Sequence, residues 1–128
     1  RNRVGAWLYY FPTGELFSEE YYVNGVLEGD LKNYYKNGVV TEHSQYKNGL
    51  KNGFSRKYSD TAILIEELHY LNGKENGMAK FFELNGDLKE KGMYKNGNRF
   101  GKWEYYMDGE IASEEAKKKA KKGYKKNK

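Results

Sequence analysis

The sequence contains no cysteine and a single proline among its 128 residues. The absence of cysteine excludes a disulfide framework, a cysteine-based zinc site and a thiol nucleophile. Hydrophobic residues are few, at 38%, and no run of about 18 apolar residues is present to form a membrane-spanning helix. The chain begins at Arg1 without a recognisable leader. These absences favour a single domain of ordinary length without a thick aliphatic core.

Charge is divided unevenly along the chain. Residues 1–112 carry 15 Lys and Arg against 16 Asp and Glu, a net charge of −1. Residues 113–128 carry 8 Lys against 2 Glu, a net charge of +6. A nucleic-acid-binding domain needs a basic face, and a neutral body does not require one. We therefore expect no specific nucleic-acid partner.

Aromatic rings replace the missing aliphatic residues. They make up 16% of the chain and include 13 tyrosines. A tyrosine can pack its ring while its hydroxyl stays in water, and aromatic residues favour strands. This composition is typical of a thin β-structure with both faces near solvent.

Self-similarity with a 24-residue period is the strongest signal in the sequence. With the first glycine of each unit counted as position 1, five units begin at Gly5, Gly29, Gly53, Gly77 and Gly101. Position 6 is aromatic and position 12 aliphatic: Tyr10, Tyr34, Tyr58, Phe82 and Tyr106, then Leu16, Val40, Leu64 and Leu88. Position 18 is tyrosine in the first four units, and Asn-Gly follows it at positions 20 and 21. The fifth unit lacks this second half.

Each unit is expected to form a β-hairpin. Asn-Gly between strand-like segments is a strong hairpin signal, because both residues tolerate the positive φ of tight turns. We therefore predict an all-β fold, an elongated antiparallel β-meander of five tandem 24-residue hairpin repeats with nine or ten short strands. The repeat array occupies residues 1–112, and a basic segment follows at residues 113–128.

The first turn of each unit lies near position 10. A three-residue loop with a left-handed glycine would place position 6 opposite position 12, so that Tyr and Leu pair on one face, and we prefer it to a two-residue loop for that reason. Ile111 fits the pattern if the last loop is one residue shorter. The third unit has Ser-Asp-Thr-Ala at 59–62, which predicts a larger or distorted loop. That loop is either sequence variation that a surface loop tolerates or a partner-binding feature beside the apolar residues 63–65.

The C-terminal segment predicts a short helix from Ser113 to Lys122. Ser113 can cap the helix, two glutamates follow it, and Gly123 can end it. A helix of roughly ten residues is marginal unless docked, so a disordered tail is the alternative. The candidate contacts for anionic lipid or an acidic partner are Lys117, Lys118, Lys119, Lys121 and Lys122.

The recurring pattern Gly-x(4)-Tyr-x(5)-Leu-x(5)-Tyr-x-Asn-Gly resembles the MORN repeat, in particular its variant in bacterial YwqK-type antitoxin proteins. The stretches Tyr-Tyr-Lys-Asn-Gly at 34–38 and Tyr-Lys-Asn-Gly at 46–49 are most similar to that family. The resemblance covers residues 5 to 111. It implies an elongated, twisted sheet of stacked hairpins that binds other proteins, and it implies no catalytic residue.

No group of residues in the sequence indicates catalysis or metal binding. The carboxylates that recur at position 14 are Glu42, Glu66 and Glu90. A repeat gives equivalent groups equivalent environments, unlike a catalytic carboxylate pair, so we interpret them as a solvated ladder with lysine partners such as Lys57. His43 and His69 have no second histidine nearby and are expected to be surface strand residues. We expect no enzyme activity, no metal and no cofactor.

Aromatic residues at positions 3, 5 and 7 gather in the first and last complete strands. Their alternate spacing places them on one face. Trp and Tyr are common anchors of protein interfaces, although bulky rings in terminal repeats also cover the open ends of a core. The middle units vary at these positions, as a contact surface would. The candidate partner-binding residues are Trp7, Tyr9, Phe11, Tyr35, Phe81, Trp103, Tyr105 and Met107.

The sequence therefore favours a non-enzymatic protein-binding repeat module, and the resemblance implies a bacterial antitoxin or immunity protein that covers a toxin. The alternative is a scaffold at the envelope or membrane surface, whose basic tail contacts anionic lipid at on the order of 1 kcal/mol per lysine. Localisation follows function. An antitoxin would be in the bacterial cytoplasm, and a chain whose upstream leader had been removed would be in the envelope or secreted.

Overall fold

The computed structural model describes residues 2–112. Residue 1 and residues 113–128 are outside this range, and so are the predicted helix and its five candidate lysines. Within residues 2–112 the fold is all-β, without a helix. The prediction of an open antiparallel sheet of hairpins is confirmed for this part of the chain.

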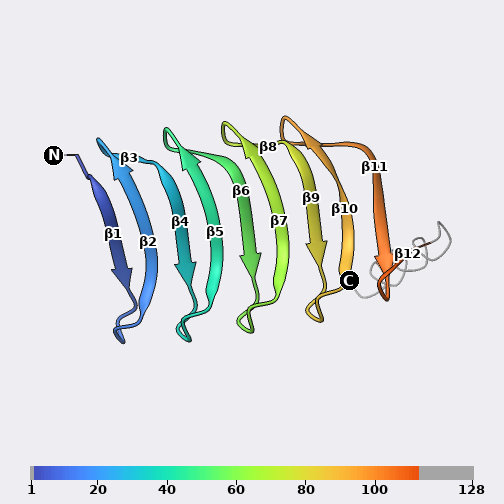
Figure 1. Cartoon of the computed structure of the whole chain (residues 1–128), viewed down its shortest axis with the longest axis horizontal. Coiled ribbons are helices and arrows are strands. Elements are labelled where there is room, and N and C mark those ends of the chain that lie inside the picture. Colours follow the sequence, from blue (N-terminus) through green and yellow to red (C-terminus); the bar gives the residue numbers. More distant parts are fainter. Residues whose placement is uncertain (1, 113–128) are drawn as a thin grey trace, which may run out of the picture.

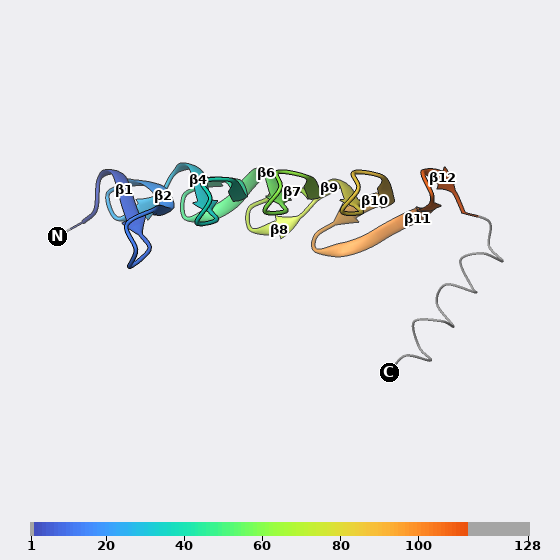
Figure 2. The ribbon, with the colours of Figure 1, turned by 90° about the horizontal axis from the view of Figure 1, so that it is seen from below.

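One antiparallel sheet contains all twelve strands of the described residues. Ten strands cross the sheet in chain order, and the two-residue strands β3 and β8 pair beside this path (Figure 1). Seen from below in Figure 2, the sheet is a long single row. The strands are β1 (Gly5–Tyr10), β2 (Leu16–Val23), β3 (Val26–Leu27), β4 (Gly29–Tyr34), β5 (Val40–Lys47), β6 (Leu50–Tyr58), β7 (Leu64–Leu71), β8 (Lys74–Glu75), β9 (Gly77–Phe82), β10 (Leu88–Lys95), β11 (Asn98–Met107) and β12 (Glu110–Ile111).

The first four long hairpins close through three-residue loops. In the first, Phe11 N donates to Glu15 O and Gly14 N donates to Phe11 O, both at 2.8 Å, and Gly14 has φ 104°. A type I turn followed by a left-handed residue is the usual three-residue hairpin loop. It pairs position 6 with position 12, as predicted: Tyr10 with Leu16, Tyr34 with Val40, Tyr58 with Leu64, and Phe82 with Leu88.

The third loop corrects the sequence prediction of a larger or distorted turn. Ser59 N donates to Ile63 O at 2.8 Å and Ala62 N to Ser59 O at 2.9 Å, so the loop has the same hydrogen bonds as the others. Ala62 takes the left-handed position at φ 68°. The Ser59 hydroxyl accepts from Thr61 N at 3.3 Å and Ile63 N at 3.1 Å. These bonds hold the turn in place although alanine replaces the favoured glycine.

Asn-Gly turns connect the units at the opposite ends of the strands. Asn48 and Gly49 have φ 53° and 82°, as a type I′ turn requires. Gly49 N donates to Leu27 O at 2.9 Å, a residue of the preceding turn region. Glu28 Oε1 also accepts from Asn48 N at 2.8 Å. The turns therefore join consecutive units as well as reversing the chain.

The last hairpin has a two-residue loop. Asp108 and Gly109 have φ 53° and 81°, between the paired residues Met107 and Glu110. Tyr106 then pairs with Ile111, so the predicted loss of one loop residue is confirmed.

The register divides the side chains between two faces of the sheet. We call the face with positions 3, 5, 7, 14, 16, 18 and 23 the packed face, and that with positions 2, 4, 6, 12, 15 and 17 the open face. Contacts between neighbouring strands agree with this division. Ser44 Oγ and Ser55 Oγ are 2.7 Å apart on the packed face, and the rings of His43 and Phe54 are 4.9 Å apart on the open face.

The core is a row of buried residues that crosses the packed face. Its members are Leu31, Ser44, Ser55, Leu68, Ala79, Gly92 and Trp103. The Trp103 ring occupies the space into which a side chain at Gly92 would project, and it meets Tyr94 edge-on at 5.3 Å. Small residues in the row let larger neighbours on the same face cover it, so the core needs no second layer.

The glutamates at position 14 are only partly exposed, whereas the sequence interpretation was a solvated ladder. The side chains of Glu42, Glu66 and Glu90 are 21%, 23% and 17% exposed. They lie on the packed face, where neighbouring strands flank them. A basic partner is present as predicted: Lys57 Nζ is 3.6 Å from Glu66 Oε2, and Arg99 pairs with Glu90 at 3.2 Å.

Candidate functional site

The aromatic residues predicted as partner contacts lie on the packed face, where one of them belongs to the core and two pack against it. Trp103 is 8% exposed and forms a cluster with Leu68 and Ala79. Phe81 and Tyr105 pack against this cluster. Trp103 Nε1 donates to Met93 O at 3.2 Å. These rings stabilise the C-terminal part of the sheet.

Trp7 and Tyr9 are at the N-terminal end of the packed face. Trp7 is 39% exposed, and the Arg3 guanidinium lies 4.6 Å from its ring centre. Arg3 Nη1 also donates to Tyr9 Oη at 2.8 Å. The same arrangement occurs at the other end, where Arg99 lies 3.9 Å from the Trp103 ring. Cation–π contacts of this kind cover the faces of both indoles.

The remaining predicted contacts lie near the three-residue loops. Phe11 meets Phe17 edge-on at 5.1 Å, and the Tyr35 hydroxyl donates to Tyr58 O at 2.8 Å. Met107 is 47% exposed beside the last turn. The structure therefore distributes the eight predicted residues along the packed face and does not gather them into one site.

Polar groups on the packed face are paired with one another. Burial raises the pKa of Glu42, but the hydrogen bond from Ser44 Oγ at 2.7 Å and Lys51 Nζ at 3.1 Å outweigh it, so the pKa lies below the usual range. Lys51 Nζ also lies 5.0 Å from the Tyr70 ring centre. Burial, followed by the charge of Glu75, raises the pKa of Tyr70 to about 12. Few groups of this network are left to bind a partner.

The open face carries a charged row across the sheet, formed by positions 4 and 15. From β1 to β11 the row is Leu8, Glu19, Lys32, His43, Arg56, Glu67, Lys80, Lys91 and Glu104. Arg56 Nε bonds Glu67 Oε2 at 2.9 Å, and Lys91 Nζ is 3.6 Å from Glu104 Oε1. Opposite charges on facing positions stabilise strand pairing.

Exposed apolar side chains lie at the β1 end of this row and beside it. On the open face they are Leu8, Tyr10, Tyr21, Met78 and Met93, each between 39% and 58% exposed. Methionine side chains adapt to irregular surfaces, and tyrosine combines an apolar ring with a polar tip. The open face thus presents apolar and charged groups side by side.

Two shallow clefts open on this face. The first has a volume of about 280 Å³ and is lined by Lys32, Val40, His43, Tyr58 and Ala62. Its residues come from β4, β5, β6 and the third loop. The second has a volume of about 220 Å³ and is lined by Met78, Lys91, Gly92, Met93, Lys102 and Glu104.

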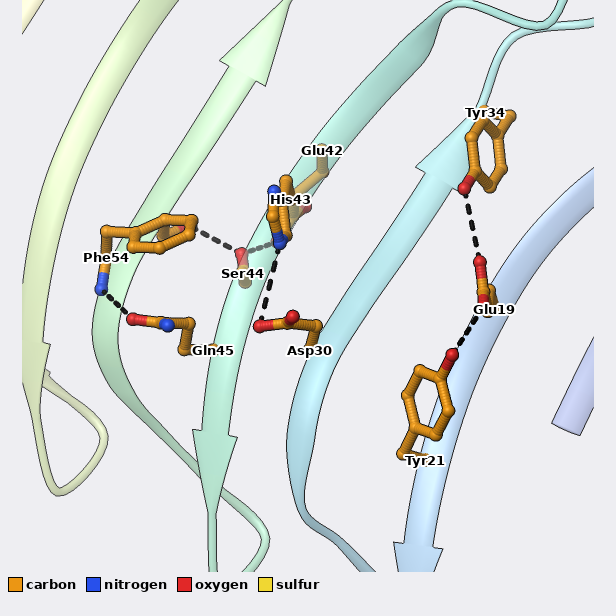
Figure 3. Close-up of polar contacts among 10 residues, drawn as sticks. Glu19, Tyr21, Asp30, Tyr34, Glu42, His43, Ser44, Gln45 and Phe54 are labelled. Carbon is orange, nitrogen blue, oxygen red and sulfur yellow. Dashed lines mark hydrogen bonds and ion pairs between the residues drawn. The ribbon is translucent and has the colours of Figure 1, made fainter. Parts of the chain in front are cut away.

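His43 is not the surface residue that the sequence predicted, whereas His69 is exposed as predicted. The His43 side chain is 23% exposed, and its Nε2 is 3.6 Å from Asp30 Oδ1 (Figure 3). That distance is too long for a hydrogen bond. Nε2 is buried and has no hydrogen-bond partner in the described residues. Phe54 packs edge-on against the ring, which explains the burial.

Glu19 lies one hairpin away from His43 and accepts two tyrosine hydroxyls (Figure 3). Tyr21 Oη donates at 2.6 Å and Tyr34 Oη at 3.2 Å. The hydrogen bond to Glu19 raises the pKa of Tyr21, and burial followed by the charge of Glu19 raises the pKa of Tyr34. Both phenols therefore stay neutral at physiological pH. Glu19 is satisfied by these donors and does not pair with Lys32.

The sequence did not single out the cleft residues Lys32, Val40, Tyr58 and Ala62 as a group. Lys32 at position 4, His43 at position 15 and Tyr58 at position 6 belong to two units and meet only through the strand register. The unusual third loop was the available signal, because Ala62 is part of the cleft lining.

No three His, Asp or Glu side chains in residues 2–112 come together to hold a metal ion. No helix within the same range is long and apolar enough to cross a membrane.

The described part of the protein is thus an open array of β-hairpin units, with a closed polar network on one face and clefts on the other. A family model described as the MORN repeat variant matches three stretches, residues 3–24, 27–48 and 75–96, which together cover just over half of the chain. The chain belongs to this family. No curated protein matches it.

Proposed function

We propose that this chain is a non-enzymatic protein-binding module that contacts its partner through the open face. The observation that carries the proposal is the contrast between the two faces. On the packed face, arginines cover the Trp rings and the glutamates have basic partners. The open face holds both of these clefts, with the exposed Met78 and Met93. An apolar surface mixed with charge is typical of protein interfaces.

The proposed module consists of five units. The family model matches three stretches, and the intervening residues 49–74 share their turn geometry. Asn72 and Gly73 have φ 49° and 87°, and Ala62 takes the left-handed loop position. Equivalent units place equivalent groups in equivalent environments, which supports a binding surface over a catalytic centre.

The partner we propose is a toxin, which would make the chain a bacterial antitoxin. The similarity of its motifs to YwqK-type repeats supports this part of the proposal. Affinity capture from the source cell is expected to recover one protein in stoichiometric amount. Recovery of lipid alone would favour the membrane-surface alternative and contradict the proposal.

Variants then locate the binding face. Met78→Glu with Met93→Glu places two charges on the open face, and we expect it to abolish capture of the partner. Phe17→Glu is the matched control, because Phe17 is 44% exposed and its ring contacts Phe11 of the packed face, while each methionine is 40% exposed. Circular dichroism must show that all variants are folded. Loss of capture only with Phe17→Glu would place the interface on the packed face and refute the proposal.

A further inference from the structure

Two residues that line the first cleft, Lys32 and Tyr58, have hydrogen-bond donors without partners in residues 2–112, and the ring of His43 lies between them. Lys32 Nζ forms no ion pair within residues 2–112, and the Tyr58 hydroxyl has no hydrogen bond there. His43 Nε2 is buried and unsatisfied. This nitrogen faces Asp30 and has no accessible surface, so the donors that remain for a ligand are Lys32 Nζ and the Tyr58 hydroxyl. A ligand that supplies acceptor oxygens would pair with both of them.

We propose that this cleft binds a carboxylate side chain from an acidic segment of the protein partner. The inference rests on the proposed function and names the chemistry of the contact. The lysine ammonium and the phenol O–H both donate to carboxylate oxygens. Val40 and Ala62 complete the lining, and they can contact the methylene groups of an aspartate or glutamate.

The charges around the cleft favour a singly charged group. The cations are Lys32 and Arg56, and Arg56 is already bonded to Glu67 at 2.9 Å. Asp30 lies 3.6 Å from His43. A phosphate dianion would meet one free lysine and the repulsion of Asp30, whereas a carboxylate carries half that charge. The cleft therefore fits an acidic side chain better than a phosphate group.

The second cleft provides a contrast on the same face. Its own carboxylate, Glu104, lies 3.6 Å from Lys91 Nζ and accepts the Tyr106 hydroxyl at 3.1 Å. A carboxylate thus lines the second cleft, whereas none lines the first. Lys102 lines the second cleft and serves as a matched control for Lys32.

The test is a titration of the full-length, isotope-labelled chain with a blocked hexapeptide of alternating Glu and Leu, followed by NMR. We expect chemical-shift changes at His43, Lys32 and Tyr58. The peptide with Gln in place of Glu should bind about tenfold more weakly, because it lacks the charge. Lys32→Gln should weaken binding of the Glu peptide about tenfold, and Lys102→Gln should leave it unchanged.

Other outcomes would overturn the inference. Equal binding of the Gln peptide would make the contact apolar, and unchanged affinity in Lys32→Gln would place the peptide elsewhere. Inorganic phosphate that competes at the same concentration as the Glu peptide would show a general anion site. His43→Gln supplies a second variant, provided circular dichroism shows that it folds.

The two proposals can fail separately. If the Glu peptide binds in the cleft but no protein partner is captured, the proposed function fails and the carboxylate site remains. If a partner is captured with equal affinity by Lys32→Gln and by the unaltered chain, the cleft inference fails and protein binding remains.

Discussion

Gly92→Ala is expected to be among the most destabilising single-methyl additions in this protein. A Cβ at Gly92 would lie 2.2 Å from Trp103 Cδ2 and 2.4 Å from Cε2. Both contacts are shorter than real Cβ atoms tolerate, so the indole must move. Gly92 has no positive φ, so alanine suits its backbone, and the substitution would otherwise stabilise a strand by about 0.5–1 kcal/mol.

The cost follows from what Trp103 contacts. Overpacking a core typically costs about 1–3 kcal/mol. Displacing the indole also breaks its Nε1 hydrogen bond to Met93 O, which contributes about 0.5–1.5 kcal/mol. The ring would lose its contacts with Phe81 and Tyr94 as well. After the strand preference of alanine is subtracted, we expect a net loss of about 2–4 kcal/mol.

A double-mutant cycle measures this prediction. Urea unfolding of the unaltered chain, Gly92→Ala, Trp103→Leu and the double variant is followed by circular dichroism, since Trp103→Leu removes a fluorophore. A smaller side chain at 103 relieves the clash, so Gly92→Ala should cost nothing, or stabilise slightly, in that background. An equal cost in both backgrounds would refute the clash as the cause.

Further substitutions test the turns and the packed face. Ala62→Gly should stabilise the chain by about 0.5–1 kcal/mol, because it relieves a left-handed alanine at φ 68° against a smaller entropic cost; a lower midpoint in urea would contradict this. Gly49→Val should cost about 2 kcal/mol or more, since Gly49 has φ 82° and its added Cβ would lie 3.3 Å from Val26. Glu66→Ala removes one ion pair and should cost less than about 1 kcal/mol. A lower melting temperature for Glu66→Ala than for Gly49→Val would be evidence against the face assignment. Folding raises the pKa of Tyr70 from 10.0 to about 12, so the neutral phenol is favoured in the folded state. Its contribution to the free energy of unfolding is complete below pH 10 and is lost as the pH rises through 12. The free energy of unfolding of Tyr70→Phe should therefore fall less steeply with pH in this alkaline range. A slope equal to that of the unaltered chain would contradict the raised pKa of Tyr70.

The hairpin architecture could be predicted because it depends on local chemistry. Asn24, Gly25 and their equivalents take positive φ through their own backbone preferences, so their spacing in the sequence marks the turns directly. The pairing of Tyr10 with Leu16 follows from loop length and strand alternation. Even the shortened last loop could be read from the position of Ile111.

The third loop was mispredicted because the sequence pattern considered glycine at the left-handed position and not the local hydrogen bonds of a serine hydroxyl. Ala62 is unfavourable in the left-handed region, but the Ser59 hydroxyl bonds Thr61 N and Ile63 N and holds the loop. The glutamate ladder was mispredicted for a different reason, which is tertiary. Whether Glu42 is solvated depends on how far side chains of neighbouring strands cover it, and Lys51 is one of these.

The sequence alone determined the period, the turns and the strand order, because each depends on residues within one 24-residue unit. Only the tertiary structure decided which face packs and which stays open. Position 92 has room only for glycine because the ring of Trp103, eleven positions later, occupies the space of a side chain. Likewise Lys32, His43 and Tyr58 line one cleft only when three strands align in register. Burial and site geometry are properties of neighbouring strands together, and one unit does not specify them.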